Sequence, residues 1–509
     1  MFSRAIDQHS PRKQLAPEMT LPIFPELNRP QYPPNPELLQ SSLAWKIAGE
    51  SPTAMYIFER VAELKKSHEH MTITRPDKQL KENDDETWNR WLREVKSRLL
   101  QDHDHGERAA ELARTILDAI EGIQQPNAAG KTAVPITFQA ALLQNARGVL
   151  GVKRPPNFSL IIDSLYSLGG NGTGDTASQL WHKANQHFSP DGTLATLNST
   201  IQHGLKPYPD DDDASSSSPQ TDILPLTPAW FHQAKASSPF HWFHDTWKKL
   251  TSDDWRHALP TRRWCDWATC VLRTAIGACY LWEATFYREL ANGLLDSSLE
   301  PETVKRKMFS LSSPMLTWKH RGPVSTRDVA SHIRSTTRIG LNAMRFLKND
   351  MITKCNHLAE LDSDTPSSFV DWITQCRSVL NDRDNELQSG LEKALREPFV
   401  RRHQNTLETI TYSLLCRAPL GIHADHYGML AKRGPRFSIV EPSPEWPVVI
   451  ASLACPSPGV PTRLGDVRRK LRQLGLTPSH ATLIYTLESA GMCQSSHDAD
   501  DAIEVNPGF

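Results

Sequence analysis

Cysteine is scarce in this chain of 509 residues, and a long apolar segment is absent from it. The eight cysteines never form a Cys-x-x-Cys pair, so the sequence predicts reduced thiols rather than a disulfide framework. The most apolar stretch, Thr274 to Trp282, lies between Arg273 and Glu283 and is far shorter than the ~20 residues that cross a bilayer. Residues 1–14 are polar and charged, without the apolar run of a secretory signal. We therefore expect a cytoplasmic protein that does not enter the membrane.

The chain also has no large excess of positive or negative charge, because its 57 lysines and arginines nearly equal its 58 aspartates and glutamates. This balance excludes a globally basic nucleic-acid binder and a polyacidic tail protein. Any electrostatic partner must therefore be recognised by a local patch of the surface. At about 150 residues per domain, the length predicts roughly three folding units.

Complete catalytic motifs are missing as well. The chain has no Gly-x-Ser-x-Gly elbow and no His-Glu-x-x-His helix. The segment Asn127 to Thr132 ends like a phosphate-binding loop, but Gln125 occupies the position of the first required glycine. The glycine-rich run 169–174 lacks a lysine and the spacing of a dinucleotide fingerprint, and it predicts a flexible turn. These departures favour a binding or assembly role over catalysis.

Histidines and carboxylates gather in four places, and both groups are ligands for zinc, manganese or iron. The four candidates are His68-Glu69-His70, His103-Asp104-His105, His423-Ala424-Asp425-His426, and His241 with His244. Solvated helix ends and satisfied core histidines explain such clusters more often than metal does. The sequence therefore predicts no catalytic residue, no metal and no cofactor, and a metal-dependent hydrolase centred on one cluster is kept as an alternative.

The helical period of the apolar residues predicts a mainly α fold, a multidomain helical protein. Seven of the 14 tryptophans fall between residues 230 and 282. Thr261 is the expected N-cap of a long helix on which Trp264, Trp267 and Trp282 share a broad face. Tryptophans at this spacing usually form a core, although nearby arginines would also suit a platform for stacking bases.

Composition predicts the domain boundaries. Four aspartates followed by four serines, between prolines, bury nothing to offset chain entropy and indicate a mobile linker. The predicted segments are a Pro-rich arm (1–36), a helical N-terminal domain (37–205), the acidic and Ser-rich linker (206–227), a Trp-rich helical domain (228–440) and a C-terminal module (441–509).

The central domain contains a strongly basic segment, residues 305–348, with ten cations against the single acid Asp328. Its cations are Lys305, Arg306, Lys307, Lys319, Arg321, Arg327, Arg334, Arg338, Arg345 and Lys348. Such a cluster can neutralise nucleic-acid phosphates and release counterions. A helix capped by Ser325 and a second helix around Leu341 would form a loose helix-turn-helix. Alternatively, these cations pair with acids such as Asp350, Asp362 or Glu392, or line a subunit contact.

The C-terminal module resembles a winged-helix domain. We expect helices from Glu445 to Ala454, after a Thr462 cap and after a Ser479 cap, followed by a short strand at residues 502–505. The third helix has no lysine or arginine, and the predicted wing is acidic. The second helix holds Arg463, Arg468, Arg469, Lys470 and Arg472. This distribution favours protein assembly and leaves a nonstandard DNA contact open.

The Trp-rich stretch Leu259 to Leu290 and the C-terminal module resemble large uncharacterised subunits encoded in bacterial multi-gene antiphage or DNA-restriction systems. The resemblance implies a non-catalytic partner that joins an ATPase, helicase or nuclease to DNA. We therefore expect a nucleic-acid-binding accessory subunit, with the ten cations above and Arg468, Arg469 and Arg472 as contacts. The alternative is an assembly scaffold that holds another protein without nucleic acid.

Overall fold

The structure is a computed structural model. It describes residues 27–30, 33, 36–50, 56–57, 93, 112, 121–124, 131–142, 158–170, 174–186, 195, 198, 206–207, 237–309, 315–318, 329–348, 369–381, 386–398, 401–418, 424–433, 437–493 and 503–509. The first two histidine clusters, the predicted linker after residue 207 and the predicted acidic wing lie outside these residues.

Helices dominate the described residues, which confirms the mainly α prediction. They are α1 (Pro36–Glu50), α6 (Phe138–Leu142), α8 (Phe158–Gly169), α9 (Ala177–Gln186), α12 (Pro239–Leu250), α13 (Asp253–Ala258), α14 (Thr261–Leu295), α15 (Pro301–Phe309), α16 (Val329–Phe346), α18 (Phe369–Asn381), α19 (Glu386–Arg396), α20 (Arg401–Leu414), α21 (Glu445–Ser452), α22 (Leu464–Gln473) and α23 (His480–Ser489).

The strands are short and form antiparallel pairs. The pairs are β1 (Tyr56–Ile57) with β4 (Lys206–Pro207), β2 (Glu121–Gln124) with β3 (Lys131–Ala133), β5 (Leu430–Arg433) with β6 (Phe437–Val440), and β7 (Thr462–Arg463) with β8 (Glu504–Val505). Lys131 and Thr132 belong to β3, whereas a phosphate-binding loop would place them at the start of a helix.

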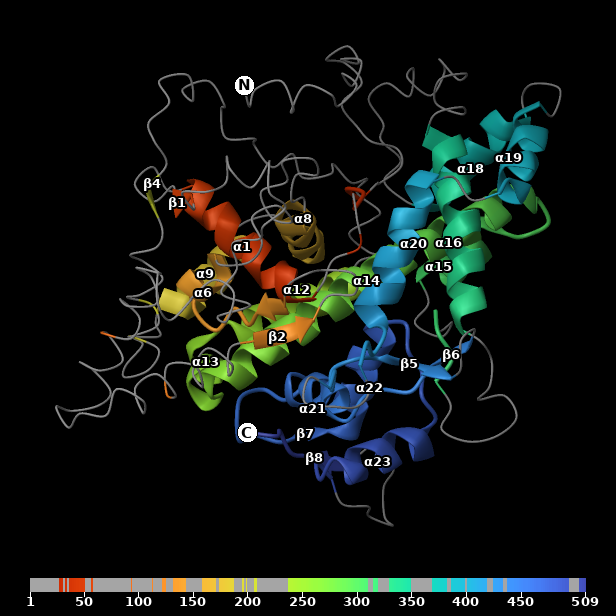
Figure 1. Cartoon of the computed structure of the whole chain (residues 1–509). Helices are drawn as coiled ribbons and strands as arrows, with labels where there is room; N and C mark the ends of the chain where they lie inside the picture. Colours follow the sequence, from red (N-terminus) through yellow and green to blue (C-terminus); the bar gives the residue numbers. More distant parts are fainter. Residues whose placement is uncertain are drawn as a thin grey trace.

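The 35-residue helix α14 runs through the middle of the molecule, with α1, α8 and α12 beside it and α16 and α20 crossing it (Figure 1). Trp264 and Trp267 are buried on α14, which confirms that these tryptophans form core. Trp282 is half-buried and stacks on Phe286, with ring centroids 5.1 Å apart. The predicted cap is wrong by one residue, because Pro260 is the N-cap and Thr261 is the first helical residue.

A glycine sets the contact between α14 and α16. A Cβ atom at Gly340 would lie 2.0 Å from the carbonyl oxygen of Ala284, which is closer than any real side chain can approach. Because glycine has no Cβ, the two helices pack backbone to backbone at this point. A similar contact joins α8 to α12, since a Cβ at Gly169 would lie 1.9 Å from the Phe240 oxygen.

The described part of the predicted N-terminal arm contacts α14. The Arg29 guanidinium donates two hydrogen bonds to the Glu283 carboxylate, at 2.7 and 2.6 Å, and the Leu27 amide donates a third at 2.9 Å. Glu283 is buried in the apolar centre of α14, so it depends on these donors to stay ionised there. The arm therefore docks on the body through a charge-assisted contact.

A buried ion pair ties α14 to the end of α20. The Arg273 guanidinium bonds both carboxylate oxygens of Asp425, at 2.8 and 2.9 Å, and also the carbonyls of Ser413 and Leu415. Both partners of the pair are 3% exposed. Burial would raise the pKa of Asp425, but Arg273 together with Arg417 holds it below its usual value. The pair is therefore fixed in its ionised form.

The C-terminal module has three helices followed by the strand β8, in the predicted winged-helix-like order, and β8 pairs with β7, a strand that was not predicted. The Ser479 hydroxyl accepts a hydrogen bond from the Thr482 amide at 3.2 Å, which confirms the cap of the third helix. The predicted cap of the second helix is wrong by one residue, because the N-cap is Arg463, the last residue of β7. The Thr462 hydroxyl donates to the Asp466 carboxylate in the first turn of this helix at 2.9 Å. The module packs against α12 and α14 and lies below them in Figure 1.

One continuous cluster of buried apolar residues extends from Leu27 to Val505. The N-terminal helices, the Trp-rich helices and the C-terminal module therefore pack against one another. A search of the described helices finds no segment with the length and apolar character needed to span a membrane.

Candidate nucleic-acid interface

The first three predicted contacts lie toward the C-terminal end of α15. There the positive charges of Lys305, Arg306 and Lys307 complement the negative end of the helix dipole. Lys305 is half-buried and lies 3.8 Å from Glu302. Arg306 and Lys307 are exposed, and Arg306 also donates to the Thr303 hydroxyl at 3.0 Å. Two cations of this helix are thus open to solvent.

The predicted helix-turn-helix in the basic segment is wrong. Residues 329 to 346 form the single helix α16, and Gly340, which lies within it just before Leu341, packs against α14. Its missing side chain serves close helix packing and not a turn. The described basic residues therefore have no helix-turn-helix geometry with which to enter a DNA groove.

Two of the predicted contacts on α16, Arg338 and Arg345, bond groups of the same chain and are half-buried. Arg338 donates to the carbonyl oxygens of Leu395, in the last turn of α19, and of Glu397, just after it, at 3.0 and 2.8 Å. Arg345 pairs with the Glu397 carboxylate, and the Asn342 amide adds a bond to the Glu397 carbonyl at 3.1 Å. These donors satisfy carbonyl groups that a helix end leaves without partners. The internal pairing that the sequence left open thus occurs, with Glu397 as the acid.

The remaining cations of the basic segment differ in exposure. Arg334 is exposed on α16, and Lys348 is half-buried beyond its end. Lys319, Arg321 and Arg327 lie outside the described residues. The described cations of residues 305–348 are therefore divided between solvent and the protein interior.

The arginines of the C-terminal module lie on α22. Leu464, Val467 and Leu471 face the core, and Arg469 and Arg472 are exposed on the opposite side. Residues three apart are neighbours on a helix surface, so these two guanidinium groups share one face. Arg469 pairs with Asp466 at 2.5 Å, with its side chain 63% exposed. Arg468 is half-buried at the edge of this face.

A short segment, residues 315–318, joins α16 to the end of α22. The Leu316 amide donates to the Gly475 carbonyl at 3.3 Å, and Leu316 forms a parallel bridge with Leu476. The His332 ring bonds the Met315 carbonyl at 2.9 Å. The start of α16, which carries Arg334, is therefore tied to the end of α22.

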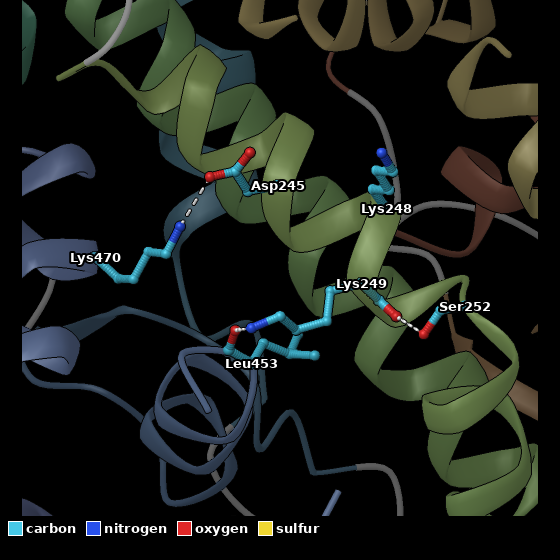
Figure 2. A pocket seen from close by; sticks show the side chains of 6 residues that line it. All are labelled: Asp245, Lys248, Lys249, Ser252, Leu453 and Lys470. Atoms are coloured by element: carbon cyan, nitrogen blue, oxygen red, sulfur yellow. Dashed lines mark hydrogen bonds and ion pairs between the residues drawn. The ribbon is translucent and has the colours of Figure 1, made fainter. Parts of the chain in front are cut away.

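A cleft of about 440 Å³ lies between α12 and the C-terminal module. Its lining residues are Asp245, Lys248, Lys249, Ser252, Leu453 and Lys470. Figure 2 shows Lys470 reaching from α22 to Asp245 on α12, with an Nζ to Oδ2 distance of 3.1 Å. The Lys249 and Lys470 side chains enter the cleft from opposite walls, while the Lys248 ammonium extends away from them in this view.

Lys249 is fixed at the bottom of this cleft. Its ammonium donates to the carbonyl oxygen of Leu453 at 3.0 Å and to that of Cys455 at 2.5 Å, just beyond the end of α21. Burial and, to a smaller extent, the neighbouring Lys470 ammonium lower the pKa of Lys249. The cleft therefore holds two positive charges close enough to repel each other.

The third helix of the module presents a different surface. Its exposed residues include Ala481, Tyr485 and Glu488, and Tyr485 is 48% exposed. Winged-helix domains that bind DNA usually use this helix for base contacts, but α23 offers an aromatic ring and a carboxylate. This face suits contact with protein better than contact with phosphate.

Two of the candidate metal-ligating histidines, His241 and His244, have protein partners. His241 bonds the Gly169 carbonyl and His244 bonds the Tyr166 carbonyl, at 3.3 and 3.2 Å, so both rings join α12 to α8. Burial lowers the pKa of His244. Asp425, the acid of the last histidine cluster, is paired with Arg273. Among the residues that the structure describes, no group of three histidines, cysteines or carboxylates could hold a metal.

The sequence identified Lys470 only as one cation of the second C-terminal helix, and it did not single out Lys248 or Lys249. Lys248 and Lys249 are adjacent in the last turn of α12, and this adjacency was the only local sign that they could belong to a basic site. Their neighbour Lys470 follows more than 200 positions later, so only the folded chain brings the three together.

No protein-family model matches the chain, and no curated protein matches it either. The resemblance to subunits of antiphage and DNA-restriction systems stays a prediction.

Proposed function

We propose that this chain is a nucleic-acid-binding accessory subunit whose phosphate contacts come mainly from α22. The observation that carries the proposal is the exposed face with Arg469 and Arg472, beside Arg468, on a helix whose other side is fixed in the core. Arginine forms bidentate hydrogen bonds with phosphate and stays charged at every physiological pH. A rigid helix presents these groups with little loss of entropy on binding.

The surroundings of α22 support the same proposal. Arg334 belongs to the helix that residues 315–318 tie to the end of α22, so it can extend the basic surface. Arg306 and Lys307 on α15 are exposed and can contact phosphates farther along a bound strand. Arg338 and Arg345 hold α19 and are not proposed as contacts.

We further propose that the bound nucleic acid is duplex DNA and that the chain brings it to a catalytic partner, such as an ATPase, helicase or nuclease subunit. The proposed arginine contacts are made to the phosphate backbone of DNA and give little base selectivity. The absence of cations among the exposed residues of α23 supports a positioning role rather than sequence readout.

The test is equilibrium binding of a labelled duplex with 5′-hydroxyl ends, measured by fluorescence anisotropy between about 50 and 200 mM salt. We expect affinity to fall steeply as salt rises. The double variant Arg469→Gln/Arg472→Gln should lower the slope of log K against log salt by about one for each arginine. The matched control is Lys393→Gln, an exposed cation on α19, which lies far from α22 (Figure 1).

Equal affinity and equal salt slope for the double variant and the unmodified protein would contradict the proposal. The same measurement with single-stranded RNA of matched length distinguishes the two nucleic acids. Tighter binding to RNA would overturn the duplex-DNA assignment.

The exposed Tyr485 favours a second function, the assembly of a protein complex through α23. Tyrosine is enriched in protein interfaces because it buries a large rigid ring. If α23 binds the catalytic partner, that partner should co-purify after nuclease treatment and be lost with Tyr485→Arg. The control Tyr412→Arg changes a similarly exposed tyrosine on α20 and should retain the partner.

A further inference from the structure

The cleft between α12 and the C-terminal module has features of a binding site that nucleic-acid binding by α22 does not require. We propose that it binds one phosphate group in its dianionic form, held between Lys249 and Lys470. The inference does not depend on the proposed function, because Arg469 and Arg472 point away from the core side of α22 and do not line the cleft.

The charges of the cleft favour an anion. Three of its lining residues are lysines, and Asp245 is its only lining carboxylate. Asp245 is shared, because the His241 ring lies 3.3 Å from the same oxygen that accepts from Lys470. The ammonium groups therefore exceed the carboxylate by two charges, and a dianion would balance them.

Free donor positions are also present. An ammonium group carries three N–H donors. Lys249 uses two of them for the carbonyls of Leu453 and Cys455, and the third stays available. Lys470 uses one for Asp245 and keeps two. A tetrahedral oxyanion between the two amines can accept from both without displacing these bonds.

The site is built from fixed parts. Lys249 lies two residues after the fully buried Trp247 on α12, and its ammonium group is held by a carbonyl just beyond the end of α21. The Ser252 hydroxyl donates to the Lys249 carbonyl at 2.7 Å and closes one side of the cleft. Lys248 is exposed at the rim and has a flexible stem, so its amine can turn toward a bound anion.

The chemistry selects a phosphate monoester over a carboxylate. A phosphate monoester carries a charge of about −1.5 to −2 at pH 7 and three strong acceptor oxygens. A carboxylate supplies one charge and would leave a positive charge uncompensated beside Lys249. The volume of about 440 Å³ lies within the range of small-molecule sites, so it admits the phosphate with part of the molecule that carries it.

The experiment is titration calorimetry of the full chain with inorganic phosphate at constant ionic strength, with acetate as the carboxylate comparison. We expect saturable binding of phosphate at one site and much weaker binding of acetate. Lys470→Gln should weaken phosphate binding by at least about tenfold, because it removes a charge-assisted hydrogen bond. The control Lys393→Gln should bind like the unmodified protein, and circular dichroism should show equal helix content for both variants.

Two further measurements identify the source of the phosphate. Duplex DNA with 5′-phosphate ends is compared with the same duplex carrying 5′-hydroxyl ends, and a mononucleotide is titrated separately. A preference for the phosphorylated ends that Lys470→Gln abolishes assigns the site to nucleic-acid termini. Binding of the mononucleotide alone assigns it to a small phosphorylated molecule.

Absence of saturable phosphate binding would overturn the proposal. Equal binding by Lys470→Gln and the unmodified protein would do so as well. Since the duplex with hydroxyl ends tests α22 separately, failure of the phosphate site leaves the nucleic-acid result unchanged, and the reverse also holds.

Discussion

Two arginines of the helical body, Arg273 and Arg338, differ in their roles from the exposed arginines of α22. On α14 and α16, Arg273 and Arg338 point inward and bond carbonyl groups or a buried carboxylate. On α22, Arg469 and Arg472 point outward from a helix whose other side is core. The same residue type thus joins helices in one region and offers charge to a partner in the other. A count of cations along the sequence does not distinguish these roles, whereas the burial of each side chain does.

The largest loss of stability is expected for the buried arginine, Arg273. Arg273→Met would leave the buried Asp425 carboxylate without its bidentate partner and with only the longer contact to Arg417 at 3.8 Å, which costs about 3–5 kcal/mol of unfolding free energy. Urea denaturation measures the change. The control Arg262→Gln removes an exposed arginine from the same helix, 52% exposed beside Asp266, and should change stability by less than about 0.5 kcal/mol. A similar loss for both variants would contradict the assigned difference in depth.

The Arg273→Met variant should also reverse the direction in which acid changes the contribution of Asp425 to stability. In the unmodified protein the pKa of Asp425 is lowered, so its contribution to stability is present above the pKa of an unfolded carboxyl and is lost as pH falls. Without Arg273, burial raises this pKa, and protonation then favours the folded state. The stability difference between Arg273→Met and the unmodified protein should therefore narrow from neutral pH toward pH of about 4. A constant difference over this range would mean that Asp425 is not the affected group.

An intermediate effect is expected on α16. Arg338→Met removes two hydrogen bonds from a charged donor to carbonyls at the C-terminal end of α19, which should cost about 1.5–3 kcal/mol of unfolding free energy. Duplex affinity and its salt slope should be unchanged as long as the protein is folded. A variant with unchanged stability and weaker duplex binding would show that Arg338 contacts phosphate.

The smallest effect on stability is expected on α22. Arg472→Gln should change the unfolding free energy by less than about 0.5 kcal/mol, because the side chain is exposed on the surface of α22. It should nevertheless lower the salt slope of duplex binding by about one. A large loss of stability without a change in slope would place Arg472 with the arginines of the body.

Local patterns predicted the helices well. The tryptophan spacing of residues 261–295 indicated a buried helix, and α14 is that helix. Ser479 was recognised as a cap from its own neighbours, and it caps α23. Both features depend on residues within a few positions, so a single sequence contains the information needed to predict them.

The roles of the basic residues could not be predicted in the same way. The partner of Arg345 is Glu397, on a segment 52 positions later, and the sequence suggested Glu392 among the acids. The sequence predicted two helices where α16 is continuous, because the contact of Gly340 with α14 is invisible in the sequence. The cleft could not be predicted for the same reason, because Lys249 and Lys470 come together only after α12 and α22 have packed against each other.

The most direct test of the account compares all these arginines at once. Phenylglyoxal modification of the folded protein, read residue by residue by mass spectrometry with and without duplex DNA, reports which guanidinium groups DNA covers. The account predicts that Arg469 and Arg472 react in the free protein and are protected by DNA, while Arg273 and Arg338 react slowly in both states. Protection of Arg338 by DNA, or unchanged reactivity of Arg469 and Arg472 on binding, would contradict it.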